Sequence, residues 1–159
     1  MFSSYHSKKP ELSIDSFEII KKLGEGKFAS VFMAVEKITG FIVALKVVEK
    51  KRIIEENFLT QFIREIKIQA YLDHANIARI YGFFHDESYF YSILEMGEGG
   101  QLYDIIKNGQ TLSEESTSFI VGNLLDAISY IHDKKILHRD IKPENIVLVH
   151  VIILWFREM

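Results

Sequence analysis

Short hydrophobic runs with partial alternation dominate the first hundred or so residues of the chain. Five segments rich in Val, Ile, Phe and Tyr show the pattern of half-buried strands, at residues 17–23, 30–37, 41–49, 77–84 and 89–95. Thr39 and Gly40 give a turn signal between the second and third segments, and a polar turn at 85–88 joins the last two. We therefore predict five strands.

Hydrophobic residues at helical spacing predict the remaining elements. Residues 55–72 carry Phe58, Phe62, Ile66 and Tyr71/Leu72, which indicates one long helix. Residues 101–109 indicate a short helix that ends at Gly109, and Ser113 is a candidate N-cap for a third helix. That helix has a broad apolar stripe, made of Phe119, Ile120, Leu124, Leu125, Ile128 and Ile131. This order predicts an α+β fold, with an antiparallel sheet lobe followed by the start of a helical lobe.

Composition and charge narrow the function classes. The net charge of -3 provides no basic field, so we expect no nucleic-acid partner. The absence of cysteine excludes a disulfide framework and suits a reducing compartment. The longest nearly uncharged segment, residues 146–156, is far shorter than the about 20 residues of a membrane span. We expect an intracellular chain without a membrane segment.

A glycine-rich stretch between the first two predicted strands is a candidate phosphate loop. "LGEGKFASV" contains Gly24-x-Gly26-x-x-Ala29, where glycine lets backbone N–H groups approach phosphates. The stretch also matches a dinucleotide fingerprint, but that loop must open a helix and here a strand pattern follows. It is not a Walker A loop, because Phe28 follows Lys27 where Ser or Thr is required. An ordinary glycine hairpin remains the alternative.

Lys46 and Glu65 form a candidate ion pair. Lys46 lies among apolar residues of the third predicted strand, where an unpaired charge would be costly. Glu65 lies in the middle of the long predicted helix, which we expect to pack on that strand. The alternatives are a solvated strand edge for Lys46 and an exposed helix face for Glu65, whose neighbours are Arg64 and Lys67.

The most specific motif is "HRDIKPEN", residues 138–145. Asp140 can accept a proton from an incoming hydroxyl group, Lys142 can neutralise a transferring phosphate, and Asn145 can hold a metal ion. His138 is expected to pack and orient the segment. Because it comes after G-x-G (residues 24–26) and V-A-x-K (residues 43–46) in this order, the motif indicates phosphoryl transfer.

With these motifs the chain resembles the eukaryotic serine/threonine protein kinases, from Phe17 to Leu148. The resemblance implies a two-lobed kinase fold with a five-stranded antiparallel N-lobe sheet, one long helix and the first helices of an incomplete C-lobe. It also implies ATP and Mg²⁺ as cofactors, and a protein substrate with a Ser or Thr acceptor.

The resemblance assigns roles to individual residues. Asp140 would be the catalytic base, Lys46 would contact the phosphates and pair with Glu65, and Asn145 would be a magnesium ligand. Leu94 would be the gatekeeper. Adenine would lie between four apolar side chains and meet the Glu95 carbonyl and the Gly97 N–H. The residues implied to bind the nucleotide are Leu23, Gly24, Glu25, Gly26, Lys27, Val31, Ala44, Lys46, Leu94, Glu95, Gly97 and Val147.

The segments around 61–86 and 129–148 look most like the Aurora group. Lys142, in D-x-K, is the serine/threonine-type residue. The resemblance implies a location in the cytoplasm or nucleus, with association with the spindle only by analogy to that group.

The expected division of the chain is a lead-in (1–12), a kinase N-lobe (13–95), the hinge and partial C-lobe (96–148) and an atypical apolar tail (149–159). A D-F-G segment is expected near position 158, where the chain has "LWFREM". We therefore expect the 159 residues to have little or no activity by themselves. A non-catalytic nucleotide- or partner-binding fragment and an unstable fragment are the alternatives. A short isoform and an error in the gene model are the two explanations for this ending.

The apolar stripe of the third predicted helix would normally pack on a later C-lobe helix. We expect its exposed part to attract a chaperone or another partner.

Overall fold

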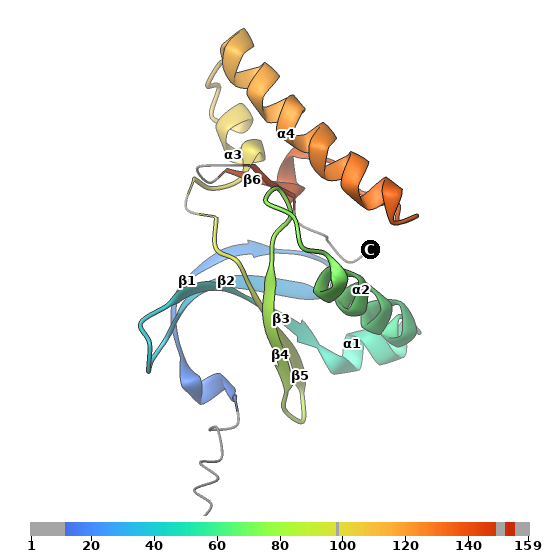
Figure 1. Ribbon diagram of the computed structural model, residues 1–159. Helices are drawn as coiled ribbons and strands as arrows, with labels where there is room; N and C mark the ends of the chain where they lie inside the picture. The colour runs from blue at the N-terminus through green and yellow to red at the C-terminus, as the bar shows by residue number, and fades with distance from the viewer. Residues whose placement is uncertain (1–11, 98, 149–151, 155–159) are drawn as a thin grey trace, which may run out of the picture.

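The computed structural model describes residues 12–97, 99–148 and 152–154 (Figure 1). Its main sheet has five antiparallel strands in the order β1-β2-β3-β5-β4. The strands are β1 (Phe17–Glu25), β2 (Ala29–Glu36), β3 (Ile42–Glu49), β4 (Ile80–His85) and β5 (Tyr89–Leu94). A single 3₁₀ turn, Ile14–Ser16, precedes β1. The five strands and the α+β class predicted from the sequence are confirmed.

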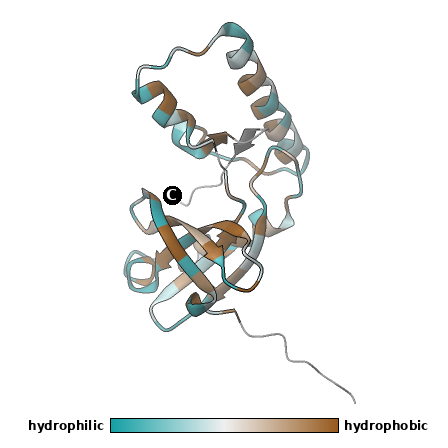
Figure 2. Ribbon diagram, turned by 90° about the vertical axis from the view of Figure 1, so that its left-hand side faces the viewer, coloured by the Kyte–Doolittle hydropathy of each residue, from teal (hydrophilic) through white to brown (hydrophobic). Residues whose placement is uncertain are grey.

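The two faces of the sheet carry different sets of residues. Residues that face each other across neighbouring strands share one face, and the faces alternate along each strand. Ala44, Lys46 and Val48 of β3 therefore share a face with their β5 partners Leu94 and Ser92. Intervening residues of the sheet form a buried hydrophobic cluster, made of Phe17, Ala34, Val43, Leu45, Tyr91 and Ile93. Figure 2 shows hydrophobic residues along these strands.

Two helices, not one, follow β3. The long helix predicted over 55–72 is wrong at its start: α1 (Lys50–Glu55) ends there and α2 (Leu59–Tyr71) begins four residues later. Asn57 has a φ of 61°, a left-handed backbone that no α-helix contains, so the chain turns at this position. Phe62 of α2 is 2% exposed and packs with Val48 of β3 and with Ile53 of α1.

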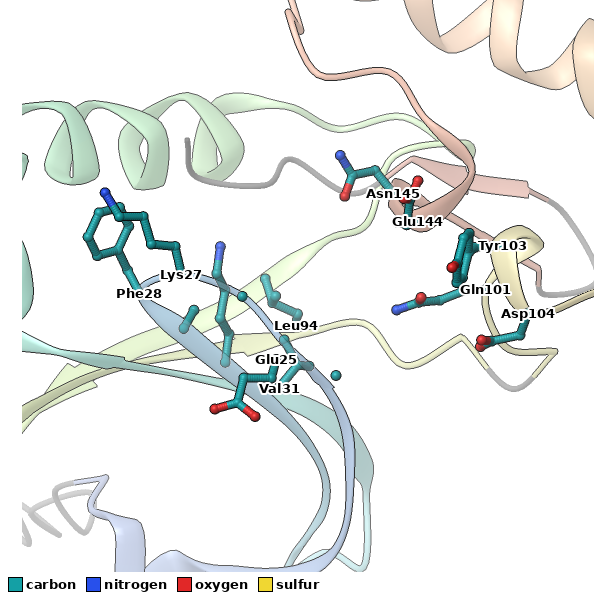
Figure 3. Close-up of a pocket in the computed structure, with 14 residues that line it drawn as sticks. Glu25, Lys27, Phe28, Val31, Leu94, Gln101, Tyr103, Asp104, Glu144 and Asn145 are labelled. Carbon is teal, nitrogen blue, oxygen red and sulfur yellow. The ribbon is translucent and has the colours of Figure 1, made fainter. Parts of the chain in front are cut away.

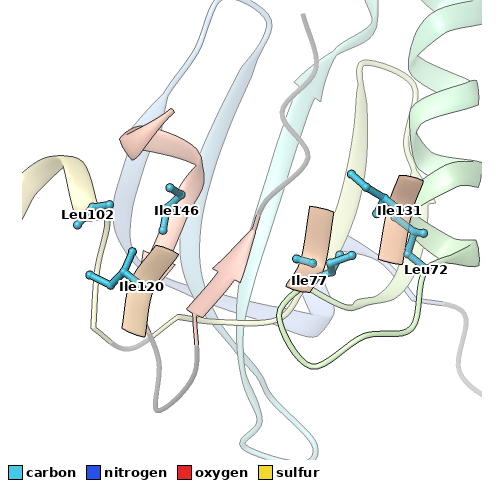
Figure 4. Packing of buried hydrophobic residues seen from close by; sticks show 7 residues of the cluster. Leu72, Ile77, Leu102, Ile120, Ile131 and Ile146 are labelled. Carbon is cyan, nitrogen blue, oxygen red and sulfur yellow. The ribbon is translucent and has the colours of Figure 1, made fainter. Parts of the chain in front are cut away.

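The helical part contains α3 (Leu102–Lys107) and α4 (Glu114–Asp133). Gly109, with a φ of 73°, follows α3 in the predicted place. Ser113 is the N-cap of α4 as predicted, because its Oγ accepts a hydrogen bond of 3.1 Å from the Ser116 N–H. Figure 4 shows the cluster that α4 joins, made of Leu72, Ile77, Leu102, Ile120, Ala127, Ile131 and Ile146.

The apolar stripe of α4 is only partly covered. Ile120 and Ile131 are buried, and Leu124 packs against the cluster. Phe119 and Leu125 are 55% and 59% exposed. The stripe is therefore divided between a packed side and a side that faces solvent, as the sequence predicted for part of it.

A second, two-stranded sheet follows the "HRDIKPEN" motif, the candidate catalytic loop. After the 3₁₀ turn Pro143–Asn145, β6 (Ile146–Leu148) pairs antiparallel with β7 (Ile152–Leu154). The strand at β7 belongs to the segment expected to be an atypical tail, so at least these three residues continue the fold. The "LWFREM" segment, where D-F-G was expected, lies outside the described residues apart from Leu154.

Hydrogen bonds tie the sheet and α2 to β6 and α4. The Gly99 N–H donates to the Leu148 carbonyl at 2.7 Å, and the Leu148 N–H donates to the Gly100 carbonyl at 2.8 Å, so the segment after β5 pairs with β6. On the other side, the Asp73 N–H donates to the Tyr130 hydroxyl oxygen at 3.0 Å, which ties the end of α2 to α4. These contacts set where residues 138–145 lie relative to the sheet.

Acid should weaken the β4–β5 hairpin through Asp86. Its carboxylate accepts hydrogen bonds from the Tyr91 hydroxyl (2.6 Å) and from the N–H groups of Tyr89 and Ser88. The Tyr91 bond and these N–H groups lower the pKa of Asp86, whereas burial and this bond raise the pKa of Tyr91. Because the folded-state pKa of Asp86 is lowered, its stabilisation is present above the unfolded pKa of about 3.9 and is lost as the pH falls through the folded value.

Tyr91→Phe removes the largest cause of this shift. We expect urea unfolding at pH 7 to show a loss of about 1 kcal/mol relative to the unaltered protein, and a clearly smaller loss at pH 3. Tyr89→Phe is the control, since Tyr89 reaches Asp86 through its backbone N–H. An equal loss at both pH values for Tyr91→Phe would contradict the assignment.

Candidate active site

The catalytic-loop motif folds around Asp140. The Asn145 side-chain nitrogen donates to the Asp140 carbonyl (2.7 Å) and to its Oδ2 atom (2.9 Å), and the Lys142 ammonium lies 2.8 Å from Oδ1. The Asp140 N–H lies 3.3 Å from His138 Nδ1. Arg139 has a φ of 66°, which reverses the chain just before Asp140. The structure thus brings Asp140, Lys142 and Asn145 together as predicted, with one carboxylate held by a cation and an amide.

Lys46 lies in the middle of β3, on the sheet face that lines the pocket and packs against α2. Its partners across the sheet are Val31 of β2 and Ser92 of β5, and its side chain is largely buried, with 7% exposure for the residue. Toward one end this face carries Ala44 and Leu94, and toward the other it carries Val48, under α2. The solvated-edge alternative for Lys46 is therefore wrong, because β3 is a central strand.

Glu65 lies on the inner side of α2. It follows Phe62 by three residues and precedes Gln69 by four, so it shares the helix side of these two buried residues. Its Oε1 atom accepts a hydrogen bond of 3.0 Å from Gln61 Nε2, and the side chain is half-buried. The fully exposed helix face is therefore excluded for Glu65. The pairing of Glu65 with Lys46 stays a prediction.

The glycine-rich stretch is a hairpin, as the strand pattern on both sides predicted. Glu25 and Ser30 are its last paired residues, and the Gly26 N–H donates to the Ala29 carbonyl at 2.7 Å. Glu25 forms an ion pair of 2.7 Å with Lys22, which lowers the pKa of the Glu25 carboxyl group. A strand on each side means that the loop can cover a ligand without opening a helix.

One pocket, with a volume of about 240 Å³, connects these parts (Figure 3). It brings together eight residues predicted from the sequence: Gly24, Glu25, Gly26, Lys27, Val31, Lys46, Leu94 and Asn145. The sheet and its hairpin loop supply the first seven residues, and the catalytic loop supplies Asn145. Residues far apart in the sequence therefore line one cavity.

The lining includes Ala29 of the predicted glycine loop, and it has walls that were not predicted as binding residues, namely Phe28, Gln101, Tyr103, Asp104 and Glu144. Figure 3 shows Gln101, Tyr103 and Asp104 at one end of the pocket and Lys27 and Phe28 at the other. Gln101 also bridges to Val147 in a short antiparallel contact, which places the start of α3 beside β6. The hydrophobic pattern of residues 101–109 gave a helix but no signal for this contact, which depends on the tertiary arrangement.

Eight of the predicted residues do not line the pocket. Within the described part of the chain, the lining leaves out Leu23, Ala44, Glu65, Glu95, Gly97, Asp140, Lys142 and Val147. Ala44 is fully buried opposite Leu94, and Asp140 is bonded to the lining residue Asn145. The Glu95 side chain turns to the N–H of Arg79, at 3.1 Å. Gly97 packs directly against Val147, because a methyl group at Gly97 would lie 2.0 Å from Val147 Cγ1.

No group of three or more His, Cys, Asp or Glu side chains is placed to hold a metal ion in the described ranges. No helix in the same ranges is both long enough and apolar enough to cross a membrane.

A five-stranded sheet with a hairpin loop and a buried strand lysine, facing a segment that holds Asp140, Lys142 and Asn145 together, is the arrangement of the protein kinase fold. The family model of the protein kinase domain matches residues 17–153, and the chain belongs to this family. The resemblance therefore extends beyond Leu148, where we expected it to end.

Among its relatives, the chain is similar to Aurora kinases, as predicted. It is 49% identical over 138 residues to the Aurora kinase of Schizosaccharomyces pombe, covering 87% of this chain and 39% of that protein. It is 46% identical over 136 residues to the Aurora kinase of Yarrowia lipolytica (86% and 37%) and 46% identical over 142 residues to Aurora kinase C of Mus musculus (89% and 51%). The chain thus spans between about two fifths and one half of the length of these relatives.

Proposed function

We propose that the pocket binds ATP with Mg²⁺, and that the kinase to which these residues belong transfers the γ-phosphoryl group to a Ser or Thr hydroxyl of a protein. The observation that carries this proposal is the shared pocket of Lys46, the glycine loop and Asn145. A protein kinase needs these three parts around one triphosphate. The fold places them together although they are far apart in the sequence.

The adenine end of the site would lie near Leu94, the proposed gatekeeper. Val31 and Leu94 line the pocket, and Ala44 lies on the same sheet face. The proposed contacts with adenine are apolar ones from Leu23, Val31, Ala44 and Val147, and hydrogen bonds with the Glu95 carbonyl and the Gly97 N–H. The Glu95 N–H already donates to the Arg79 carbonyl at 2.9 Å, which orients this backbone segment.

The phosphate end would lie at Lys46 and the loop of Gly24, Glu25, Gly26 and Lys27. A largely buried ammonium group attracts phosphate oxygens more strongly than an exposed one, because less water screens it. Glu65, on the inner side of α2, is the proposed partner that orients Lys46.

Asp140 is the proposed catalytic base. In the transfer step the substrate hydroxyl oxygen forms a bond to the γ-phosphorus, the bond from that phosphorus to the ADP oxygen breaks, and the hydroxyl proton passes to the Asp140 carboxylate. Lys142, 2.8 Å from this carboxylate, is placed to offset negative charge on the transferred group.

Asn145 fits a magnesium ion. Both of its hydrogen bonds to Asp140 use the amide nitrogen, which leaves the amide oxygen Oδ1 as the donor atom for a cation. Magnesium in kinases takes few protein oxygens and completes its shell with phosphate oxygens and water. When bound, the ion would neutralise charge on the phosphates.

Substrate and partners follow from the likeness to Aurora kinases. We propose a protein with a Ser or Thr acceptor as substrate and a location in the cytoplasm or nucleus, with the spindle as the location by analogy. The exposed Phe119 and Leu125 of α4 support the proposal that a chaperone or another protein contacts this helix.

Binding of ATP by the 159-residue chain tests the proposal. Lys46→Met keeps the length of the side chain but removes its charge, so we expect the Kd for a fluorescent ATP analogue with Mg²⁺ to rise about ten- to hundredfold. Lys37→Met is the control, since Lys37 bonds to the Asp15 carbonyl far from the pocket. If the unaltered chain does not bind ATP, or if both variants bind alike, the proposed site is wrong.

A further inference from the structure

The tip of the glycine loop is attached to the corner between α1 and α2. The Lys27 ammonium lies 2.5 Å from Glu56 Oε2, and the Lys27 carbonyl accepts a hydrogen bond of 3.3 Å from Arg52 Nη1. The same ammonium lies 4.6 Å from the centre of the Phe28 ring and 5.9 Å from that of Phe58. One cation is thus held between a carboxylate and two aromatic rings.

Phe28 gives this attachment an apolar part. The residue is only 8% exposed, although it lies at a loop tip, and its ring centre is 5.3 Å from that of Phe58. It packs in the cluster that includes Ile53 of α1 and Phe62 of α2. Phe28 and Lys27 also line the pocket, where Figure 3 shows them side by side. The loop tip therefore contacts the helices on one side and the cavity on the other.

The corner itself is fixed to both helices. The Phe58 N–H donates to the Ile53 carbonyl at 2.9 Å, and the Phe58 carbonyl accepts the N–H of Phe62 at 2.9 Å. Glu56 and Phe58 are not part of the pocket lining. A change at either residue can reach a bound nucleotide only through the loop tip or through α2.

We propose that Glu56 and Phe58 are positioning residues for the nucleotide. Through Lys27 and Phe28 they hold the glycine loop where its backbone N–H groups can contact the phosphates. They also couple the loop to α2, which carries Glu65. This inference rests on the proposed ATP site. A loop that is held before binding loses less conformational freedom when the nucleotide arrives, so the attachment raises affinity. Adenosine, which has no phosphates, should not sense it.

The test compares ATP and adenosine binding to the whole chain. Glu56→Gln keeps the shape of an exposed side chain and removes the ion pair, so we expect the Kd for ATP with Mg²⁺ to rise about two- to fivefold, while that for adenosine stays the same. In a Lys27→Met background, Glu56→Gln should add no further change, because its partner is already gone. Phe58→Leu should also raise the Kd for ATP, because it removes the ring that packs on Phe28.

Glu55→Gln is the matched control. Glu55 is the neighbouring carboxylate, 61% exposed and 3.9 Å from Lys51 on the outer side of α1. An ATP affinity of Glu56→Gln equal to that of Glu55→Gln, or equal weakening for ATP and adenosine, would overturn the positioning role while leaving the ATP site intact. Failure of the unaltered chain to bind ATP would overturn both.

Discussion

Asp140→Asn is expected to lower the rate of phosphoryl transfer by about a thousandfold in a kinase-length polypeptide that carries these residues. The amide has nearly the same shape as the carboxylate, but it cannot accept the hydroxyl proton in the transfer step. It also loses the ion pair of 2.8 Å with Lys142. Transfer of labelled γ-phosphate to a serine peptide, at saturating ATP, measures the change.

Nucleotide binding separates the chemical role of Asp140 from a structural one. Asp140 does not line the pocket, so the Kd for ATP should change by less than about threefold in the Asp140→Asn variant. Equal transfer rates for the variant and the unaltered protein would exclude Asp140 as the base. Binding of ATP without any transfer by either protein would favour a non-catalytic nucleotide-binding module.

The strands of the sheet and the candidate catalytic residues could be predicted from local sequence patterns. Alternation along β3 fixes which residues share a face, so Ala44, Lys46 and Val48 follow from the sequence once the strand is known. A strand pattern on both sides of Gly24 and Gly26 was enough to predict a hairpin in place of a helix start. The motif around Asp140 also needed no tertiary information, because its contacts span only a few residues.

The features that the sequence did not predict depend on a positive φ or on tertiary contacts. Asn57 looks like a tolerable helix residue, yet its left-handed backbone separates α1 from α2 and creates the corner that holds the loop tip. Phe28 looks like an exposed loop residue and is buried by partners on three other elements. Gln101 and Tyr103 reach the pocket because the segment after β5 pairs with β6, a contact that no periodicity encodes.

Gly97→Ala is expected to be among the most damaging small substitutions in the chain. A methyl group there would lie 2.0 Å from Val147 Cγ1 and 3.1 Å from its Cβ, far closer than carbon atoms approach. Val147 is 4% exposed and held in β6, so its short side chain has little room to move. Either β6 or the segment after β5 must shift, which we expect to cost about 1–3 kcal/mol.

Because Gly97 follows β5, which ends at the proposed gatekeeper Leu94, the same shift should weaken nucleotide binding. Thermal unfolding should show a Tm lower by about 3–10 °C, and ATP affinity should fall several-fold. Gly122→Ala is the control: it lies on α4 with open space around it, and alanine in a helix should raise stability by up to about 1 kcal/mol.

Val147→Ala tests the cause of the damage. On its own it should destabilise the protein by leaving a small void, but combined with Gly97→Ala it removes Cγ1, the atom that the new methyl group would meet at 2.0 Å. The double variant should therefore be more stable than the sum of the two single effects predicts, by about 1 kcal/mol or more. Strictly additive losses would mean that the two residues are not in contact, and the pairing of the segment after β5 with β6, on which the position of Asn145 relative to Lys46 depends, would have to be reconsidered.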